Sequence, residues 1–198
     1  IMINEARLNE PGPDDNEYVE FVGTPGESLD GLTFLVIGDG NGTGVGAIEE
    51  AVALDGLAIN AAGYFLIGEP TMTIAVPDYA YELNFESNDQ TTFVLVSGFT
   101  GLFGDDLDTD DDGVLDIEPW DSVIDCVAFI GPDPASGDPV YCDVQVGPDG
   151  IYTPGHAYLC DASWLVGTFA LSVLDTPGSA NNCDTSDSDD DGVIDSVD

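Results

Sequence analysis

The chain has 198 residues, of which 40 are acidic and only Arg7 is permanently basic, so that the formal net charge is −39. Carboxylates with pKa values near 4 are ionised at neutral pH, and a single arginine cannot neutralise the phosphates of a nucleic acid or an anionic membrane surface. The composition therefore excludes nucleic-acid binding, and we expect calcium, salt or both to relieve the internal repulsion.

Hydrophobic residues make up 43% of the chain and aromatic residues 9%, which is more than a disordered acidic segment carries. A chain of 198 residues can bury one substantial core, or one core with a small appendage. No apolar run approaches the roughly 20 residues of a membrane span, so direct membrane insertion is not expected. No signal-peptide pattern is present, and we expect a mature or excised segment of a longer protein.

Short apolar runs alternate with glycine, proline and aspartate along the chain, a pattern typical of an all-β sandwich or barrel. Residues 33–37 are almost continuously apolar, as in the centre of a sandwich. No stretch has convincing helical periodicity. The strands predicted in chain order are 1–6, 17–22, 32–38, 49–54, 64–68, 91–96, 123–130, 140–144, 156–160 and 168–171.

The last twelve residues follow the spacing of a calcium loop. In such loops alternate side chains turn inward, glycine at position 6 makes a sharp turn, and the next carbonyl faces the ion. Gly192 stands at position 6. The sequence predicts one Ca²⁺ bound by Asp187, Asp189, Asp191, Asp195, Asp198 and the carbonyl of Val193.

A second, less complete copy of the same spacing lies in the middle of the chain, with Gly113 at its sixth position. Its twelfth position is Pro119, which offers no side-chain ligand, so that Glu118, Asp121 or Asp106 would have to complete the shell. The ligands predicted for Ca²⁺ in this loop are Asp108, Asp110, Asp112, Asp116 and the carbonyl of Val114. A further acidic group is better explained as a charged loop before a strand than as another cation site; it consists of Asp14, Asp15, Glu17 and Glu20.

The chain has four cysteines, with no Cys-x-x-Cys spacing and no histidine cluster, so a zinc site is not expected. Two disulfides in an exported protein explain the even count better. Three pairings are open, and closeness in sequence favours Cys126 with Cys142 and Cys160 with Cys183. Together with the calcium loops, this predicts an extracellular or cell-surface location.

The only histidine, His156, follows Pro154-Gly155 and has no Gly-x-Ser-x-Gly motif to accompany it. A packing or surface role is therefore expected for it. No feature selects two of the 40 carboxylates as an acid–base pair. We therefore expect no enzymatic activity and no catalytic residue.

Six segments of the chain share a family pattern: Ile3-Asn4-Glu5, Asn9-Glu10-Pro11-Gly12-Pro13-Asp14, 16–22, 29–33, 62–68 and 176–181. Through them residues 1–182 resemble the lamin-tail domain, and the resemblance implies an immunoglobulin-like β-sandwich with a calcium-binding loop insertion. The family has no shared catalytic residues, and its bacterial members resemble secreted or surface-attached modules.

Residues 183–198 form an acidic tail that resembles a thrombospondin type 3 calcium repeat, which implies a structural spacer. The sequence thus predicts a secreted or cell-surface, calcium-stabilised structural or adhesion module without catalysis. Its expected partners are calcium ions and either further copies of itself or other surface proteins. The alternative is an accessory domain of an extracellular hydrolase such as a secreted nuclease.

Overall fold

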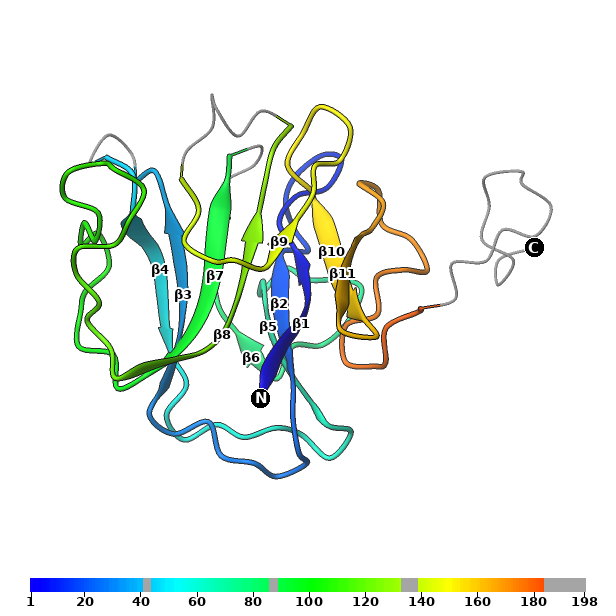
Figure 1. Ribbon diagram of the computed structural model, residues 1–198. Helices are drawn as coiled ribbons and strands as arrows, with labels where there is room; N and C mark the ends of the chain where they lie inside the picture. The colour runs from blue at the N-terminus through cyan, green and yellow to red at the C-terminus, as the bar shows by residue number, and fades with distance from the viewer. Residues whose placement is uncertain (41–43, 86–88, 133–138, 184–198) are drawn as a thin grey trace.

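A computed structural model describes residues 1–40, 44–85, 89–132 and 139–183. The acidic tail, with the predicted ligands Asp187, Asp189, Asp191, Val193, Asp195 and Asp198, lies outside these described residues. The described chain forms two β-sheets and contains no helix, so none of its segments is a helix able to cross a membrane (Figure 1). The all-β sandwich predicted from the sequence is confirmed.

The first sheet has six strands in the order β11-β10-β1-β2-β5-β6. All neighbours are antiparallel except the short β6, which pairs in parallel with β5. The N-terminal strand thus lies in the middle of this sheet and is paired on both sides (Figure 1). The strands are β1 (Met2–Arg7), β2 (Tyr18–Val22), β5 (Tyr64–Gly68), β6 (Tyr79–Ala80), β10 (His156–Cys160) and β11 (Ser163–Val166).

The second sheet has five strands in the order β4-β3-β7-β8-β9. Here β8 and β9 are parallel and the other neighbours antiparallel. The nearly continuous apolar strand β3 pairs with both β4 and β7, as expected for a strand buried on both faces. The strands are β3 (Leu32–Gly38), β4 (Ala47–Ala53), β7 (Thr91–Ser97), β8 (Ser122–Phe129) and β9 (Gln145–Val146).

Two predicted strands are wrong. In 140–144 the chain runs beside β8 as an irregular segment that is tied by a disulfide, and pairing begins only at β9. In 168–171 the carbonyls of Thr168 and Phe169 accept hydrogen bonds from Arg7 instead of from a neighbouring strand. The sequence also missed β11, because the turn before it, Asp161-Ala162, reaches positive φ without the expected glycine.

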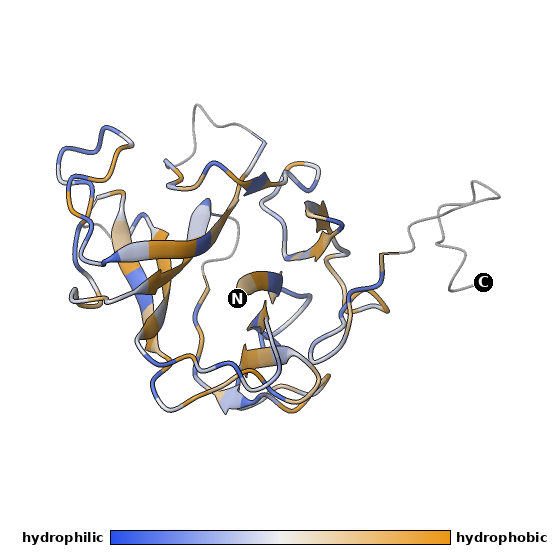
Figure 2. Ribbon diagram, turned by 60° about the horizontal axis from the view of Figure 1, so that its bottom comes forward, coloured by the Kyte–Doolittle hydropathy of each residue, from blue (hydrophilic) through white to orange (hydrophobic). Residues whose placement is uncertain are grey.

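The main core lies between the sheets and contains a cluster of aromatic rings. Phe34 of β3 packs edge-on against Phe21 of the opposite sheet and against Phe85 and Phe93. Such arrangements favour the ring quadrupoles in addition to burying apolar area. In Figure 2 the strands of both sheets carry hydrophobic stretches interrupted by hydrophilic positions, as the two-residue period of a strand requires.

Each sheet also has an outer face that an irregular segment covers. We call residues 98–121, between β7 and β8, the acidic loop; it covers Leu35, Ile37, Val94 and other apolar side chains of the five-stranded sheet. We call residues 167–183, after β11, the C-terminal segment; it lies beside β10 and β11 at the six-stranded sheet (Figure 1).

The described chain has two disulfides, and both join neighbours in sequence. Cys126 of β8 is bonded to Cys142, and Cys160 of β10 is bonded to Cys183 at the end of the C-terminal segment. This is the pairing that closeness in sequence favoured. Disulfides of this kind are typical of proteins from an oxidising, extracellular environment.

Candidate metal centre

The acidic loop is tied to the sheet at several points before its aspartates begin. The amide of Ile48 in β4 donates to the Asp105 carbonyl (2.9 Å), and the Leu107 amide donates to the Gly46 carbonyl (3.0 Å). Leu107 is buried in the apolar cluster under the loop. The loop therefore follows a fixed path up to the first predicted ligand, Asp108.

Asp108 is completely buried, although it carries a carboxylate. Its Oδ1 accepts the Asp112 amide (3.1 Å), and its Oδ2 accepts the Gly113 amide (2.8 Å) and the Tyr141 hydroxyl (2.8 Å). An ionised carboxylate has about four lone-pair sites. Three protein donors thus orient Asp108 and leave capacity for one further interaction.

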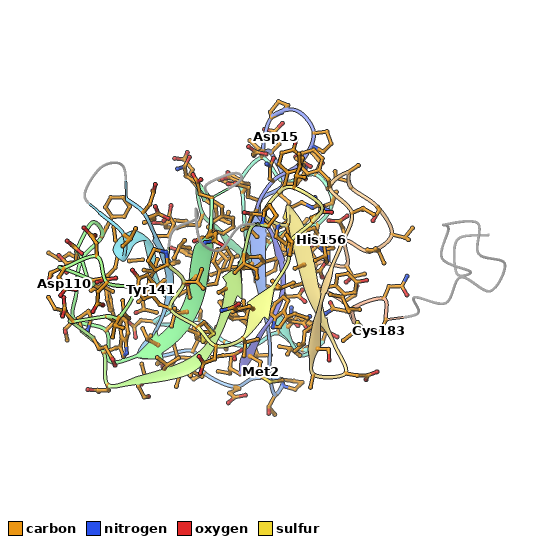
Figure 3. All side chains as sticks on the ribbon, turned by 45° about the horizontal axis from the view of Figure 1, so that its top comes forward. Met2, Asp15, Asp110, Tyr141, His156 and Cys183 are labelled. Carbon is orange, nitrogen blue, oxygen red and sulfur yellow. A yellow bond between two sulfur atoms is a disulfide. The ribbon has the colours of Figure 1, made fainter. Side chains whose placement is uncertain are left out.

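Three of the predicted carboxylate ligands come together. Asp108, Asp110 and Asp116 each offer an oxygen atom, and these oxygens lie within 4.8 Å of one another. Two oxygens bound to one calcium ion at about 2.4 Å can be at most about 4.8 Å apart. The spacing of this aspartate triad is therefore compatible with a shared cation. Figure 3 shows Asp110 and Tyr141 on the side of the molecule opposite Cys183.

The negative charges of this cluster repel one another, and no cationic side chain lies among them to offset the repulsion. The pKa of Asp110 is raised above its ordinary value, mainly by the nearby charge of Asp112 and less by desolvation, Asp116 and Asp108. Burial, followed by the hydrogen bond to Asp108, raises the pKa of Tyr141 well above its ordinary range. Tyr141 therefore stays protonated and donates to the Asp108 carboxylate.

The structure does not bring every predicted ligand into the triad. Asp112 lies outside it, and its Oδ1 accepts the Val114 amide at 2.9 Å, which shapes the turn at Gly113 (φ 86°). Asp116 also accepts the Thr109 amide (2.9 Å) and hydroxyl (2.5 Å), and these bonds close the loop.

Of the acids considered for the twelfth position, two have other contacts. Asp106 accepts the Asp108 amide at 3.2 Å. The Asp121 carboxylate lies against Gly98, where an added Cβ would be 2.3 Å from its Oδ2. Gly98 and Asp121 are the first and last residues of the acidic loop. Glu118 shares a shallow cavity with Gly113 and Val114.

Sequence reasoning missed two residues that shape the site. Tyr141 reaches Asp108 from a segment 33 positions further along the chain, and no local pattern signals this contact. Asp111, which has a positive φ of 55°, accepts the Val45 amide at 3.1 Å and so joins the loop to the β3–β4 hairpin. Gly46 permits this approach, since an added Cβ would lie 2.6 Å from the Cβ of Asp108.

The N-terminal acids were expected to form a charged loop, and for two of them this is wrong. Glu17 and Glu20 are both buried. Burial is the main cause that raises the pKa of each to about 8. Glu17 accepts the Phe85 amide (3.4 Å), whereas Glu20 accepts the side-chain amide of Asn4 (2.7 Å). The two carboxyl groups therefore have separate partners.

The only histidine and the only arginine of the chain are both buried beneath the C-terminal segment. The Nε2 of His156 lies 2.9 Å from a Glu5 oxygen that also accepts the Tyr18 hydroxyl (2.5 Å). Among the described residues the Nδ1 of His156 has no hydrogen-bond partner, and it faces Gly167, where an added Cβ would be 1.9 Å away. An N–H at Nε2 that donates to Glu5 fits this arrangement. His156 has the packing role that the sequence favoured.

A scan against models of protein families, a search of curated proteins and a search of solved structures each gave no match.

Proposed function

We propose that this chain is a secreted or cell-surface, non-catalytic structural or adhesion module that calcium stabilises. The observation that carries the proposal is the triad of Asp108, Asp110 and Asp116, whose oxygens lie within 4.8 Å of one another. The expected partners are calcium ions and further copies of the chain or other surface proteins. The likeness to the lamin-tail domain and to the thrombospondin type 3 repeat is part of the same proposal.

Three features support calcium as the ion. Oxygen ligands from carboxylates suit a hard cation of flexible coordination, and the asparagine-free triad offers three negative charges in a chain of net charge −39. The two disulfides fit an extracellular setting, where calcium is abundant enough for sites of moderate affinity. An ion here would connect Asp108, Asp110 and Asp116 within the acidic loop. It would so keep the loop closed over the five-stranded sheet.

Calorimetric titration of calcium into the chelator-treated full chain tests this function. Asp110→Asn is the informative variant, because the Asp110 side chain is exposed and the change keeps its size. We expect it to lose one bound Ca²⁺ relative to the wild type, while Asp191→Asn in the tail loses a different one. The matched control Asp161→Asn changes an exposed aspartate far from the loop and should keep the full stoichiometry.

Unchanged calcium stoichiometry in Asp110→Asn would contradict a metal centre in the acidic loop. The structural role is tested by thermal unfolding of the same proteins at low ionic strength. A ligand that binds only the folded state stabilises it by about 2.7 kcal/mol at a hundredfold excess over its Kd. Identical melting curves for wild type with calcium and with excess chelator would remove the stabilising role.

A further inference from the structure

A groove with a volume of about 370 Å³ lies where loops before and after strands of the six-stranded sheet meet the C-terminal segment, and the proposed calcium site does not involve it. Asn9, Asp149, Tyr152, Thr153 and Phe169 line it. They come from three connections: the one after β1, the one between β9 and β10, and the C-terminal segment. The volume falls within the range of small-ligand sites, about 300–1,000 Å³.

A short turn places two of these side chains next to each other. Asp149 and Tyr152 exchange both backbone hydrogen bonds, with the Asp149 amide donating at 2.9 Å and the Tyr152 amide at 3.0 Å. Residues paired in this way across antiparallel chains project their side chains to the same face. Gly150 (φ 62°) makes the turn between them. The Asp149 carboxylate and the Tyr152 ring therefore stand together at the groove.

The only arginine of the chain fixes the remaining wall. Arg7 is buried, and its Nη1 donates to the carbonyls of both Asn9 (3.0 Å) and Phe169 (2.9 Å). The Phe169 ring lies against Gly155, where an added Cβ would be 3.0 Å from its Cδ2. Two segments that are 160 positions apart in sequence are thus held in one geometry before any ligand arrives.

The aromatic rings at this groove are unusually open to solvent. Tyr152 is 56% exposed and Phe169 is 44% exposed, whereas the rings of the core are almost completely shielded from water. In the described parts of the chain, the side-chain amide of Asn9 and the carboxylate of Asp149 have no hydrogen-bonding partner. The groove therefore combines two ring surfaces with one anionic and one neutral polar group.

We propose that this groove binds an alkylammonium group, that is, an organic cation with alkyl substituents on nitrogen. The faces of Tyr152 and Phe169 attract a cation through their quadrupoles, and quaternary ammonium ligands are recognised in this way. Asp149 supplies the opposite charge. The net charge of −39 concentrates cations at the surface and repels phosphates and carboxylates, which opposes anionic ligands at the same rings.

The site is tested with choline and with 3,3-dimethylbutan-1-ol, its neutral isostere in which carbon replaces the ammonium nitrogen. Binding to the full chain is measured by ligand-observed NMR and calorimetry in excess calcium, so that the carboxylate clusters are already occupied. We expect choline to bind with a Kd on the order of 1 mM and the isostere at least about fivefold more weakly. Salt should weaken choline binding and leave the isostere unaffected.

Variants separate the groove from diffuse attraction by the acidic surface. Tyr152→Leu, Phe169→Leu and Asp149→Asn should each weaken choline binding about fivefold. The matched controls Phe103→Leu and Asp161→Asn change an exposed ring and an exposed carboxylate elsewhere and should leave the Kd unchanged. A comparison of choline with acetylated trimethyl-lysine amide tells whether a small quaternary ammonium ion or a modified peptide is the better source of the group.

Several results would overturn the proposal. Equal affinity for choline and its neutral isostere would show that the charge is not recognised. Choline binding that the three groove variants leave unchanged would place the cation on the acidic surface at large. Binding of a neutral sugar such as methyl glucoside, with no binding of choline, would assign the rings to carbohydrate stacking instead. Circular dichroism of each variant must match the wild type for the comparison to count.

Discussion

The two segments that cover the outer faces of the sandwich differ in how they are held on their sheets and in how their acidic side chains are accommodated. The acidic loop packs apolar side chains such as Leu107 and Trp120 against its sheet. It leaves Asp110, Asp111, Asp112 and Asp116 exposed to solvent and buries Asp108. The C-terminal segment instead covers a buried polar network in which Arg7 is paired with Asp175 and His156 with Glu5. One cover is anchored by apolar contact and the other by hydrogen bonds and charge.

The difference shows which of the two segments needs a bound cation or salt to be stable. In the acidic loop the like charges have no cationic side chain nearby, so that a bound cation or salt has to offset their repulsion. In the network the Arg7 guanidinium has partners for its donors in Asp175 and in the carbonyls of Asn9, Thr168 and Phe169. That cover is complete without a metal ion. The predictions below test this contrast.

The largest effect is expected from Arg7→Met, which removes the cation beneath the C-terminal segment. It leaves the Asp175 carboxylate and three carbonyls without their donor. Breaking a buried pair in this way costs about 3–5 kcal/mol, measured by urea unfolding. Adding Asp175→Asn should recover part of the loss, because the stranded charge is gone. A loss below about 1 kcal/mol for Arg7→Met would contradict the role assigned to the network.

The two disulfides should have separable effects. Cys160→Ala with Cys183→Ala opens a loop of 23 residues under the C-terminal segment and should lower the free energy of unfolding by about 3 kcal/mol in the chain-entropy model. Calcium affinity should stay the same. Cys126→Ala with Cys142→Ala releases the segment that carries Tyr141, the donor to Asp108. This pair of substitutions should weaken calcium binding as well. Equal calcium affinity for both pairs of variants would argue against Tyr141 as a support of Asp108.

The buried carboxyl groups predict that stability falls as the pH rises. Burial raises the pKa values of Glu17 and Glu20 from 4.5 to about 8. The folded state therefore binds more protons than the unfolded state, and the stability that these groups contribute is fully present below pH 4.5 and is lost as the pH rises through about 8. Each group should contribute a few kcal/mol to this change.

Unfolding at pH 5 and pH 8, in high salt and with chelator, measures this dependence without surface repulsion. Glu17→Gln and Glu20→Gln should each flatten the pH profile. The control Glu82→Gln alters an exposed carboxylate and should keep the slope of the wild type. A protein that is more stable at pH 8 than at pH 5 under these conditions would contradict the assignment.

The smallest effect is expected from Tyr141→Phe, which removes one hydroxyl. The hydroxyl donates to the buried Asp108 at 2.8 Å, and a hydrogen bond to a charged group contributes about 1.5–3 kcal/mol. We expect calcium affinity to fall about tenfold, because Asp108 then has to be oriented by backbone amides alone. Tyr79→Phe in the six-stranded sheet is the control. Unaltered calcium affinity in Tyr141→Phe would show that Asp108 needs no support from this side chain.

The sequence predicted the parts of this molecule that local patterns encode. Two-residue alternation located most strands, and the aspartate spacing placed Asp108, Asp110 and Asp116 in one group. It could not predict Tyr141 at Asp108, because that contact depends on the path of the chain after β8. Nor could it predict the pairing of Glu5 with His156 across 151 positions, since a strand pattern gives a face but not its partner. The same limit hid the burial of Glu17 and Glu20.

The central claim is that the acidic loop depends on a cation while the C-terminal segment does not. Hydrogen exchange of backbone amides with calcium and with excess chelator measures both at once. Without calcium we expect the Asp112, Gly113 and Asp116 amides to exchange about a hundredfold faster, which corresponds to 2.7 kcal/mol of lost binding, while the Thr176 and Gly178 amides stay protected. Equal loss of protection in both segments, or no loss in the acidic loop, would contradict the claim.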